Sequence, residues 1–278
     1  MSWIKSNKVK LKAKRAFLKK GTCSRTFFYI LNREFGHPKD NEEQAADYLA
    51  GGILQSGYQC GMLWGASLAV GAESYRRFNN QSVATGMAIK ATQNVLDSFI
   101  QAANSPDCGE ITNTDWKRKY SILKFLVTGK MVTCFKLAGK WAPDAVQAAN
   151  YGLSQSVADL PTTSLSCASE VVKRMGGTDE EMVIVAGLAG GIGLSGNACG
   201  ALGAAIWMNS LQRVKNGTFK SSLTDPESEK ILNAFLEVSN YEMECSKICG
   251  KQFESVEEHS EYIMSGGCQK LIETLGHR

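Results

Sequence analysis

An eleven-residue segment occurs twice in this chain and limits what it can fold into. The segment that starts at Gly51 reads GGILQSGYQCG, and the one that starts at Gly190 reads GGIGLSGNACG. Both fit GGI-x-x-SG-x-x-CG without a gap. Internal repetition indicates two copies of one unit rather than a single continuous fold. We therefore expect a basic N-terminal tail at residues 1–20, a first repeat at 21–150 and a second repeat at 151–278.

Eight of the nine cysteines follow the same repetition. Successive cysteines are 37, 48 and 26 residues apart in the first repeat, and 32, 46 and 23 residues apart in the second. The ninth, Cys249, aligns with Thr112 of the first repeat and is interpreted as a spare thiol. The matched offsets indicate that the other eight serve the chemistry of the unit. They are Cys23, Cys60, Cys108 and Cys134 in the first repeat, and Cys167, Cys199, Cys245 and Cys268 in the second.

Four thiols per unit are compatible with several roles. Free cysteines can be small buried hydrophobic residues, and they can pair as disulfides. We expect no secretory signal at the N-terminus, and patterned cysteines in a reducing compartment more often bind metal or carry out redox chemistry. Thiolates suit an iron–sulfur cluster or a tetrahedral zinc ion. No C-x₂₋₄-C pair recurs, which argues against a zinc finger or ribbon. The eight cysteines are therefore the predicted metal ligands, brought together by the tertiary structure.

Cys60 and Cys199 each follow a glycine-rich segment and are expected at the start of a helix. At that place the helix dipole and the free backbone N–H groups lower the pKa of a thiol and can hydrogen-bond thiolate or sulfide. Neighbouring glycines would let the backbone approach a bound cluster. The glycines predicted to contribute to cofactor binding are Gly57, Gly61, Gly196 and Gly200.

Helical spacing of apolar residues dominates the chain and predicts an all-α fold. One helix is expected to be capped by Asp40 or Asn41 and to run to Leu49, and another to be capped by Asp179 and to cover 180–188. Further amphipathic helices are predicted at 88–102 and 227–238, the latter with Pro226 at its first turn.

The two repeats are expected to pack as a pseudo-symmetric pair through helices rich in Gly and Ala. Small residues recur at i, i+4 and i+8, at Gly57/Gly61/Gly65 and at Gly196/Gly200/Ala204. The apolar segments 53–70 and 182–207 contain these positions and are interpreted as buried helix pairs of a soluble core. The alternative is a membrane span, because the second segment has 26 residues without a charge.

The net charge of +4 conceals two oppositely charged parts. Residues 1–20 carry eight Lys and Arg and no acidic residue, which leaves the other 258 residues at −4. A basic amphipathic tail can bind an acidic partner protein or an anionic membrane surface, or it can be a solvated helix or lead-in. We expect no nucleic-acid partner, and a cytoplasmic protein that is peripheral to a membrane if the tail binds lipid.

The remaining motifs do not predict a nucleotide-binding or catalytic function. Residues 191–196 match GxGxxG, but the acidic residue that a dinucleotide fold needs about 20 residues later is absent, and no nucleotide is expected. No Ser/His/Asp pattern, HExxH or P-loop is present, and no catalytic residue is predicted.

Each half of the chain resembles the redox-active proteins named for their C…GCAxxG…C…C cysteine pattern. The second repeat has Cys199-Gly200-Ala201-Leu202, and the first has Cys60-Gly61-Met62 with Met62 in place of the usual alanine. The resemblance covers about residues 21–278 and implies α-helical units with four cysteines and a redox or cluster role. The same unit resembles part of the split-Soret cytochromes c, where it accompanies an iron–sulfur centre. Their haem motif is absent here, so no haem is expected.

The leading hypothesis is an iron–sulfur protein for electron transfer, with one cysteine-ligated cluster per repeat. Such a protein would exchange electrons with a redox partner protein. It could also form a homo-oligomer. One alternative is a metal-free dithiol protein, pairing Cys60 with Cys23 or Cys134, and Cys199 with Cys167 or Cys268. Another is a binding module with buried or zinc-bound cysteines that docks through residues 1–20.

Overall fold

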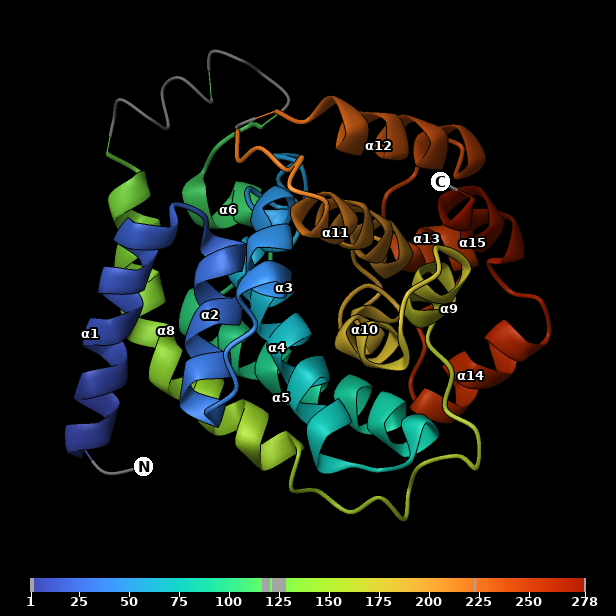
Figure 1. Cartoon of the computed structure of the whole chain (residues 1–278), viewed down its shortest axis with the longest axis horizontal. Coiled ribbons are helices and arrows are strands. Elements are labelled where there is room, and N and C mark those ends of the chain that lie inside the picture. The colour runs from blue at the N-terminus through green and yellow to red at the C-terminus, as the bar shows by residue number, and fades with distance from the viewer. Residues whose placement is uncertain (1–2, 117–120, 122–128, 223, 278) are drawn as a thin grey trace.

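The structure is a computed structural model that describes residues 3–116, 121, 129–222 and 224–277 (Figure 1). These residues form helices joined by loops, and the β-type contacts among them are two isolated bridges. The predicted all-α fold is confirmed. The helices of the N-terminal half are α1 (Trp3–Lys20), α2 (Cys23–Phe35), α3 (Asp40–Ala45), η1 (Asp47–Leu49), α4 (Gly61–Arg77), α5 (Gln81–Ala103), α6 (Cys108–Thr112) and α8 (Met131–Gly152).

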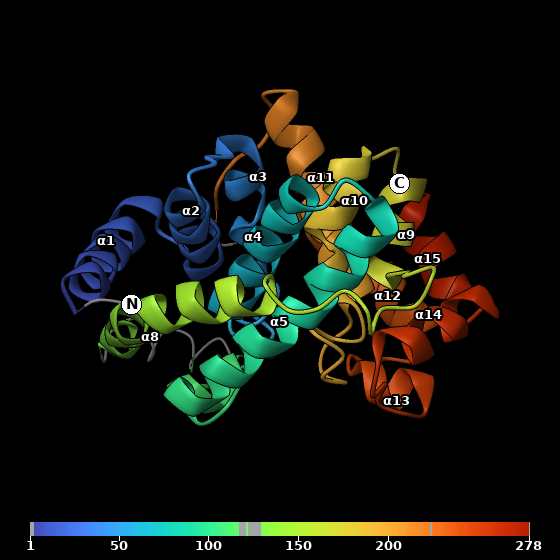
Figure 2. The same ribbon diagram turned by 90° about the horizontal axis from the view of Figure 1, so that it is seen from below.

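The C-terminal half repeats this order from α2 onwards, with several shorter helices. It begins after the loop that follows α8 and lies on the other side of the molecule (Figures 1 and 2). Its helices are α9 (Cys167–Arg174), α10 (Asp179–Ile184), η2 (Ala186–Leu188), α11 (Gly200–Lys215), α12 (Pro226–Val238), α13 (Cys245–Cys249), α14 (Val256–Met264) and α15 (Gln269–Gly276). The cysteine positions make α2 equivalent to α9, α4 to α11, and α6 to α13.

Local sequence explains where several helices begin. Pro226 is the first residue of α12, and the side chain of Asp225 accepts a hydrogen bond from the N–H of Ser228 as its N-cap. The cap expected at Asp179 is instead Thr178, which forms a capping box with Glu181. Asp40 is the first helical residue of α3 rather than its cap, and the predicted helix to Leu49 divides into α3 and the 3₁₀ turn η1.

The N-terminal segment is a docked helix. α1 lies alongside α8 and α2 (Figure 1), and Val9, Ala13 and Ala16 are buried there. Its other face carries exposed basic residues and the exposed Leu11 and Leu18. The tail predicted at residues 1–20 is therefore helical from Trp3 onwards, and from Val9 onwards one side of it packs against the first half of the fold.

The two halves share one hydrophobic core and pack through small residues. α4 contacts α10 and η2, and in the equivalent way α11 contacts α3 and η1. A Cβ at Gly71 of α4 would overlap the carbonyl oxygens of Val183 and Ile184, and one at Gly203 of α11 would overlap the ring of Trp64. These glycines bring the halves together, as predicted for helices of this composition.

The small residues at i, i+4 and i+8, which were expected between the two repeats, include a glycine that serves a contact within one repeat. A Cβ at Gly65 would overlap the backbone of Ser24, so this glycine lets α4 approach α2 within its own repeat. No helix among residues 3–116 and 129–277 is long and apolar enough to cross a membrane. The long uncharged segment that suggested a span is divided by a turn at 190–196, which separates η2 from α11.

Candidate cysteine sites

Most of the predicted ligands lie at the beginning of a helix. Four are the first residues of their helices: Cys23 of α2, Cys108 of α6, Cys167 of α9 and Cys245 of α13. Cys60 and Cys199 are the N-cap residues of α4 and α11, as the sequence predicted. Cys134 lies in the first turn of α8, and Cys268 is the N-cap residue of α15. At a helix start the first backbone N–H groups have no partner within the helix, so a thiol or another nearby acceptor can bind them.

A left-handed turn precedes Cys60 and Cys199. Residues 51–55 have φ angles of 70°, 76°, 59°, 48° and 57°, and residues 190–194 have 61°, 86°, 68°, 60° and 63°. Such angles cost about 1–2 kcal/mol for each residue with a Cβ, yet both repeats retain them. The turn points the N–H of Gly51 at the sulfur of Cys23, and the N–H of Gly190 at the sulfur of Cys167.

An isolated β-bridge holds two cysteines of each repeat next to each other. In the first repeat Cys60 N–H donates to Pro106 O at 2.7 Å, and Cys108 N–H donates to Tyr58 O at 2.7 Å. In the second, the equivalent hydrogen bonds are Cys199 N–H to Met243 O at 2.9 Å and Cys245 N–H to Asn197 O at 2.7 Å. The repeated segments therefore build the same backbone frame twice.

The four predicted cofactor glycines shape this frame in different ways. A Cβ at Gly61 would overlap the sulfur of Cys23, so this glycine lets the helix start approach a ligand thiol. The carbonyls of Gly57 and Gly196 accept hydrogen bonds from Gly109 N–H at 2.8 Å and Ser246 N–H at 2.9 Å, which fixes the starts of α6 and α13. Gly200 lies against the carbonyl of Leu188.

The four predicted ligands of the first repeat line one cavity. Its volume is about 190 Å³, and Cys23, Cys60, Cys108 and Cys134 all contribute to its wall. The left-handed turn and the apolar side chains of Phe17, Leu54, Met62, Trp116 and Met131 also line it, together with polar residues that include Asp47 and Ser222. Residues separated by more than 100 positions in the sequence are thus brought around a single small space.

The second repeat brings together its four predicted ligands and a fifth thiol. Cys249 Sγ lies 3.8 Å from Cys245 Sγ and 3.6 Å from Cys268 Sγ. Cys249, interpreted from the sequence as a spare thiol, therefore has its sulfur beside those of two predicted ligands. The signal was present as Cys245-x-x-x-Cys249, which places two thiols on one helical face. It was discounted because the first repeat has Thr112 at this position.

Thiols of the first repeat have pKa values shifted by hydrogen bonding and burial. A hydrogen bond from Cys60 lowers the pKa of Cys23, and the same bond raises the pKa of Cys60. Burial raises the pKa of Cys108, and it raises that of Cys134 to about 12. Asp107, beside Cys108, has its pKa raised to about 6 by burial and by the neighbouring carboxylates.

The second repeat has the same pattern, and Cys249 is its thiol with a lowered pKa. Burial raises the pKa of Cys167 to about 12 and that of Cys199 to about 11. Hydrogen bonds from Cys245, Cys268 and Tyr262 lower the pKa of Cys249 to about 3. The pKa values of Cys245 and Cys268 are raised, first of all by these same hydrogen bonds.

The donor set fits a thiolate-bound metal centre in its chemistry. Each repeat offers at least four sulfurs, and the first repeat adds a cavity for them to face. No three His, Cys, Asp or Glu side chains among the described residues stand as a preformed metal site. The cysteines are therefore gathered but not held in ligand geometry.

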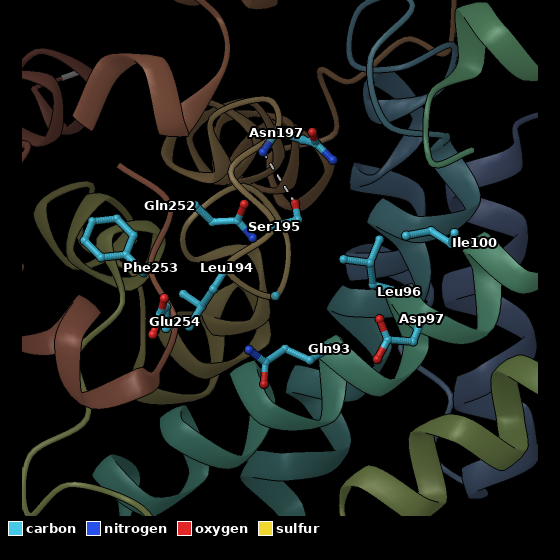
Figure 3. Close-up of a pocket in the computed structure, with 11 residues that line it drawn as sticks. Gln93, Leu96, Asp97, Ile100, Leu194, Ser195, Asn197, Gln252, Phe253 and Glu254 are labelled. Atoms are coloured by element: carbon cyan, nitrogen blue, oxygen red, sulfur yellow. Dashed lines mark hydrogen bonds between the residues drawn. The ribbon is translucent and has the colours of Figure 1, made fainter. Parts of the chain in front are cut away.

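A larger cavity of about 720 Å³ adjoins the second site (Figure 3). It lies between α5 and the left-handed turn of the second repeat, and its polar wall includes Gln93, Asp97, Ser195 and Glu254. Leu194 and Phe253 line it and belong to the same small buried cluster as Cys245.

Comparison with known proteins agrees with the duplicated cysteine frame. The model of the family described as "Putative redox-active protein (C_GCAxxG_C_C)" matches residues 22–145 and 163–277. The chain belongs to this family. Two consecutive matches show that the C_GCAxxG_C_C unit occurs in tandem. No curated protein and no solved structure matches the chain, and the resemblance to split-Soret cytochromes c stays a prediction.

Proposed function

We propose that this C_GCAxxG_C_C protein carries electrons through iron–sulfur clusters, one in each repeat, and exchanges them with a partner protein. The observation that carries the proposal is the cavity of about 190 Å³ lined by the four cysteines of the first repeat. All-cysteine donor sets are characteristic of iron–sulfur centres. Cys23, Cys60, Cys108 and Cys134 would hold the first cluster, and Cys167, Cys199, Cys245 and Cys268 the second.

Backbone geometry supports a negatively charged group at both sites. Gly51 N–H is directed at Cys23, and the N–H of Met62 at Cys60. The N–H groups of Ala201 and Leu202 are directed likewise at Cys199. Hydrogen bonds to sulfur stabilise thiolates, and they raise the reduction potential of a cluster that the sulfurs hold. When bound, the cluster would supply one-electron chemistry.

Apolar side chains form much of the wall of the first cavity and limit the contact of the sulfurs with water. Phe17, Leu54 and Met62 line it together with Trp116 and Met131. Burial also explains the raised pKa values of Cys108 and Cys134, which disfavour free thiolates at neutral pH. A bound cation would reverse this preference, because ligand thiols lose their protons to metal.

The test is the metal content of the full chain purified without oxygen. Iron, zinc and acid-labile sulfide are measured per chain beside the visible spectrum, for the parent and for Cys60→Ser and Cys199→Ser. We expect iron with matching sulfide in the parent, and a loss of roughly half of both in each variant. The double variant should contain neither.

Cys249→Thr is the matched control, because Thr112 occupies this position in the first repeat. Its iron and sulfide should equal those of the parent. Zinc without sulfide would overturn the proposal in favour of structural metal binding. A chain free of both metals after iron-replete anaerobic expression would equally overturn it and favour dithiol chemistry.

A further inference from the structure

We propose that Cys249 and Cys268 form a reversible disulfide, a redox modification of the second repeat that the first repeat cannot undergo. The pairing goes beyond the cluster function and does not depend on it. A disulfide would withdraw Cys268 from the predicted ligands, so it belongs to the second site when no cluster is bound there.

Sulfur positions carry this inference. Cys249 Sγ lies between Cys245 Sγ at 3.8 Å and Cys268 Sγ at 3.6 Å. A disulfide needs an S–S distance of about 2.05 Å. Side-chain rotation that brings Cys249 and Cys268 roughly 1.5 Å closer would make the bond.

Backbone geometry selects Cys268 rather than Cys245 as the partner. Cys245 and Cys249 are the first and last residues of α13, four positions apart. Residues at this spacing on a helix have Cβ atoms about 5–6 Å apart, whereas disulfides need about 3.5–4.5 Å. Cys268 lies on a different element, directly after Gly266 and Gly267, and is not bound by the α13 spacing.

The selected pair is also the one that solvent can reach. Cys249 and Cys268 are partly exposed, whereas Cys167, Cys199 and Cys245 are buried. A surface groove of about 490 Å³ leads to Cys268 and is lined by Val238, Ile248 and Tyr262. Tyr262 hydrogen-bonds both sulfurs of the pair. A small oxidant can therefore enter where the two thiols meet.

The first repeat lacks one half of this pair. Thr112 stands at the position of Cys249, and its hydroxyl donates to Cys108 O at 2.6 Å. Cys134, the equivalent of Cys268, thus has no partner at this position. The disulfide would make the repeats unequal in their response to oxidation.

A small-molecule disulfide supplies the oxidant, and thiol–disulfide exchange balances the step. Cys249 thiolate attacks one sulfur of the small disulfide, whose S–S bond breaks and releases one thiolate. Cys268, after losing its proton, attacks Cys249 in the mixed disulfide, which forms the Cys249–Cys268 bond and releases the second thiolate. The two protein thiols are oxidised, and the small disulfide is reduced to two thiols.

The test is peptide mapping of the full chain, stripped of metal by a chelator under reducing conditions and then treated with glutathione disulfide. Trypsin cuts after Lys247, Lys251 and Lys270, which places Cys245, Cys249 and Cys268 in three different peptides. We expect peptide 248–251 linked to 252–270, with the loss of about two free thiols per chain. Dithiothreitol should reverse both changes.

Two variants isolate the pair. Cys249→Thr should abolish the linked peptide, whereas Cys245→Ser should retain it. A link from Cys249 to Cys245, or glutathione adducts without a link, would overturn the inference. Iron and sulfide measured on the untreated chain separate the two proposals. A linked peptide in a chain that never binds iron would contradict the cluster proposal and support the disulfide. Iron loading without any linked peptide after stripping defeats only the disulfide.

Discussion

Ile53, Leu54 and Gln55 hold φ angles of 59°, 48° and 57°, although each carries a Cβ. Residues with a Cβ normally avoid the left-handed region. Three in succession can adopt it only where contacts with the surrounding fold offset the energy cost. The same strain at Ile192 and Leu194 shows that the second repeat imposes it too. Its benefit is a backbone N–H that points at a cysteine sulfur in each repeat.

Gly52 allows the first of these turns to close. Its φ is +76°, and a Cβ there would overlap the backbone nitrogen and oxygen of Tyr58. We expect Gly52→Ala to lower the free energy of unfolding by more than ~3 kcal/mol. Gly36→Ala is the control, because Gly36 has φ +86° but open space around it, and it should cost only ~1–2 kcal/mol. Equal losses in chemical denaturation would show that the overlap at Tyr58 is unimportant.

His259 makes stability depend on pH. Burial lowers its pKa to about 4, and its ring Nδ1 lies 3.2 Å from Leu165 O. The unfolded chain binds this proton near pH 6.5, so between pH 6.5 and 4 the unfolded state holds more protons and folding weakens as pH falls. The full change is about 3 kcal/mol. Denaturation at several pH values should show this loss in the parent, and His259→Gln should flatten it. A variant that keeps the full slope would assign the slope to other groups.

Among the elements, α1 differs most from its prediction, because the charge of residues 1–20 suggested a solvated or partner-binding tail. Basic residues cover its outer face, but Val9, Ala13, Ala16 and Phe17 face α8 and α2. Burial of apolar area stabilises this contact. Phe17 lines the first cysteine cavity. Deleting residues 1–20 would therefore open this cavity to solvent as well as remove the basic residues. Charge reversal at the exposed Lys8 and Lys10 is the cleaner test of docking to an acidic or anionic partner, because Lys12 is ion-paired with Glu34 of α2.

Two neighbouring residues of α1 provide a matched comparison. Phe17 is 9% exposed and packs edge-on against Phe135, while Leu18 is 76% exposed. Phe17→Ala should lower the free energy of unfolding by about 3 kcal/mol, at the lower end for buried Phe. Leu18→Ala should change it by less than about 0.5 kcal/mol. Thermal or urea unfolding measures both, and a small effect of Phe17→Ala would mean that α1 is not held as the structure shows.

On the scale of the whole molecule, Gln59 joins the two sites. It is buried, and its side-chain amide donates to Gly191 O at 2.8 Å and accepts from Ala198 N–H at 3.1 Å. Its backbone precedes Cys60, and its partner Ala198 precedes Cys199. The left-handed turn of one repeat is thus anchored by a side chain of the other.

Removing this amide should affect both repeats together. Gln59→Ala leaves Gly191 O and Ala198 N–H without this buried partner, at about 1–3 kcal/mol for each group. We expect the free energy of unfolding to fall by about 2–6 kcal/mol in a single cooperative transition. Gln101→Ala on the exposed face of α5 is the control and should be near neutral. Two separate transitions in the variant would contradict one shared core.

The sequence by itself determined the duplication, the helical class and eight of the gathered thiols. Matched offsets identify residues that recur, and helical periodicity needs only local spacing. It misplaced the cap of α10 by one residue, because Thr178 and Asp179 are both good caps and only the reach to Glu181 decides between them.

Only the tertiary structure decided which atoms meet. Cys249 was set aside because it breaks the repeat, yet the fold places its sulfur beside Cys268. The glycines expected between the repeats lie within one repeat, while Gly71 and Gly203 lie between them. Spacing along the chain specifies which face of a helix a residue occupies. The partner of that face depends on how distant helices pack, which no local pattern encodes.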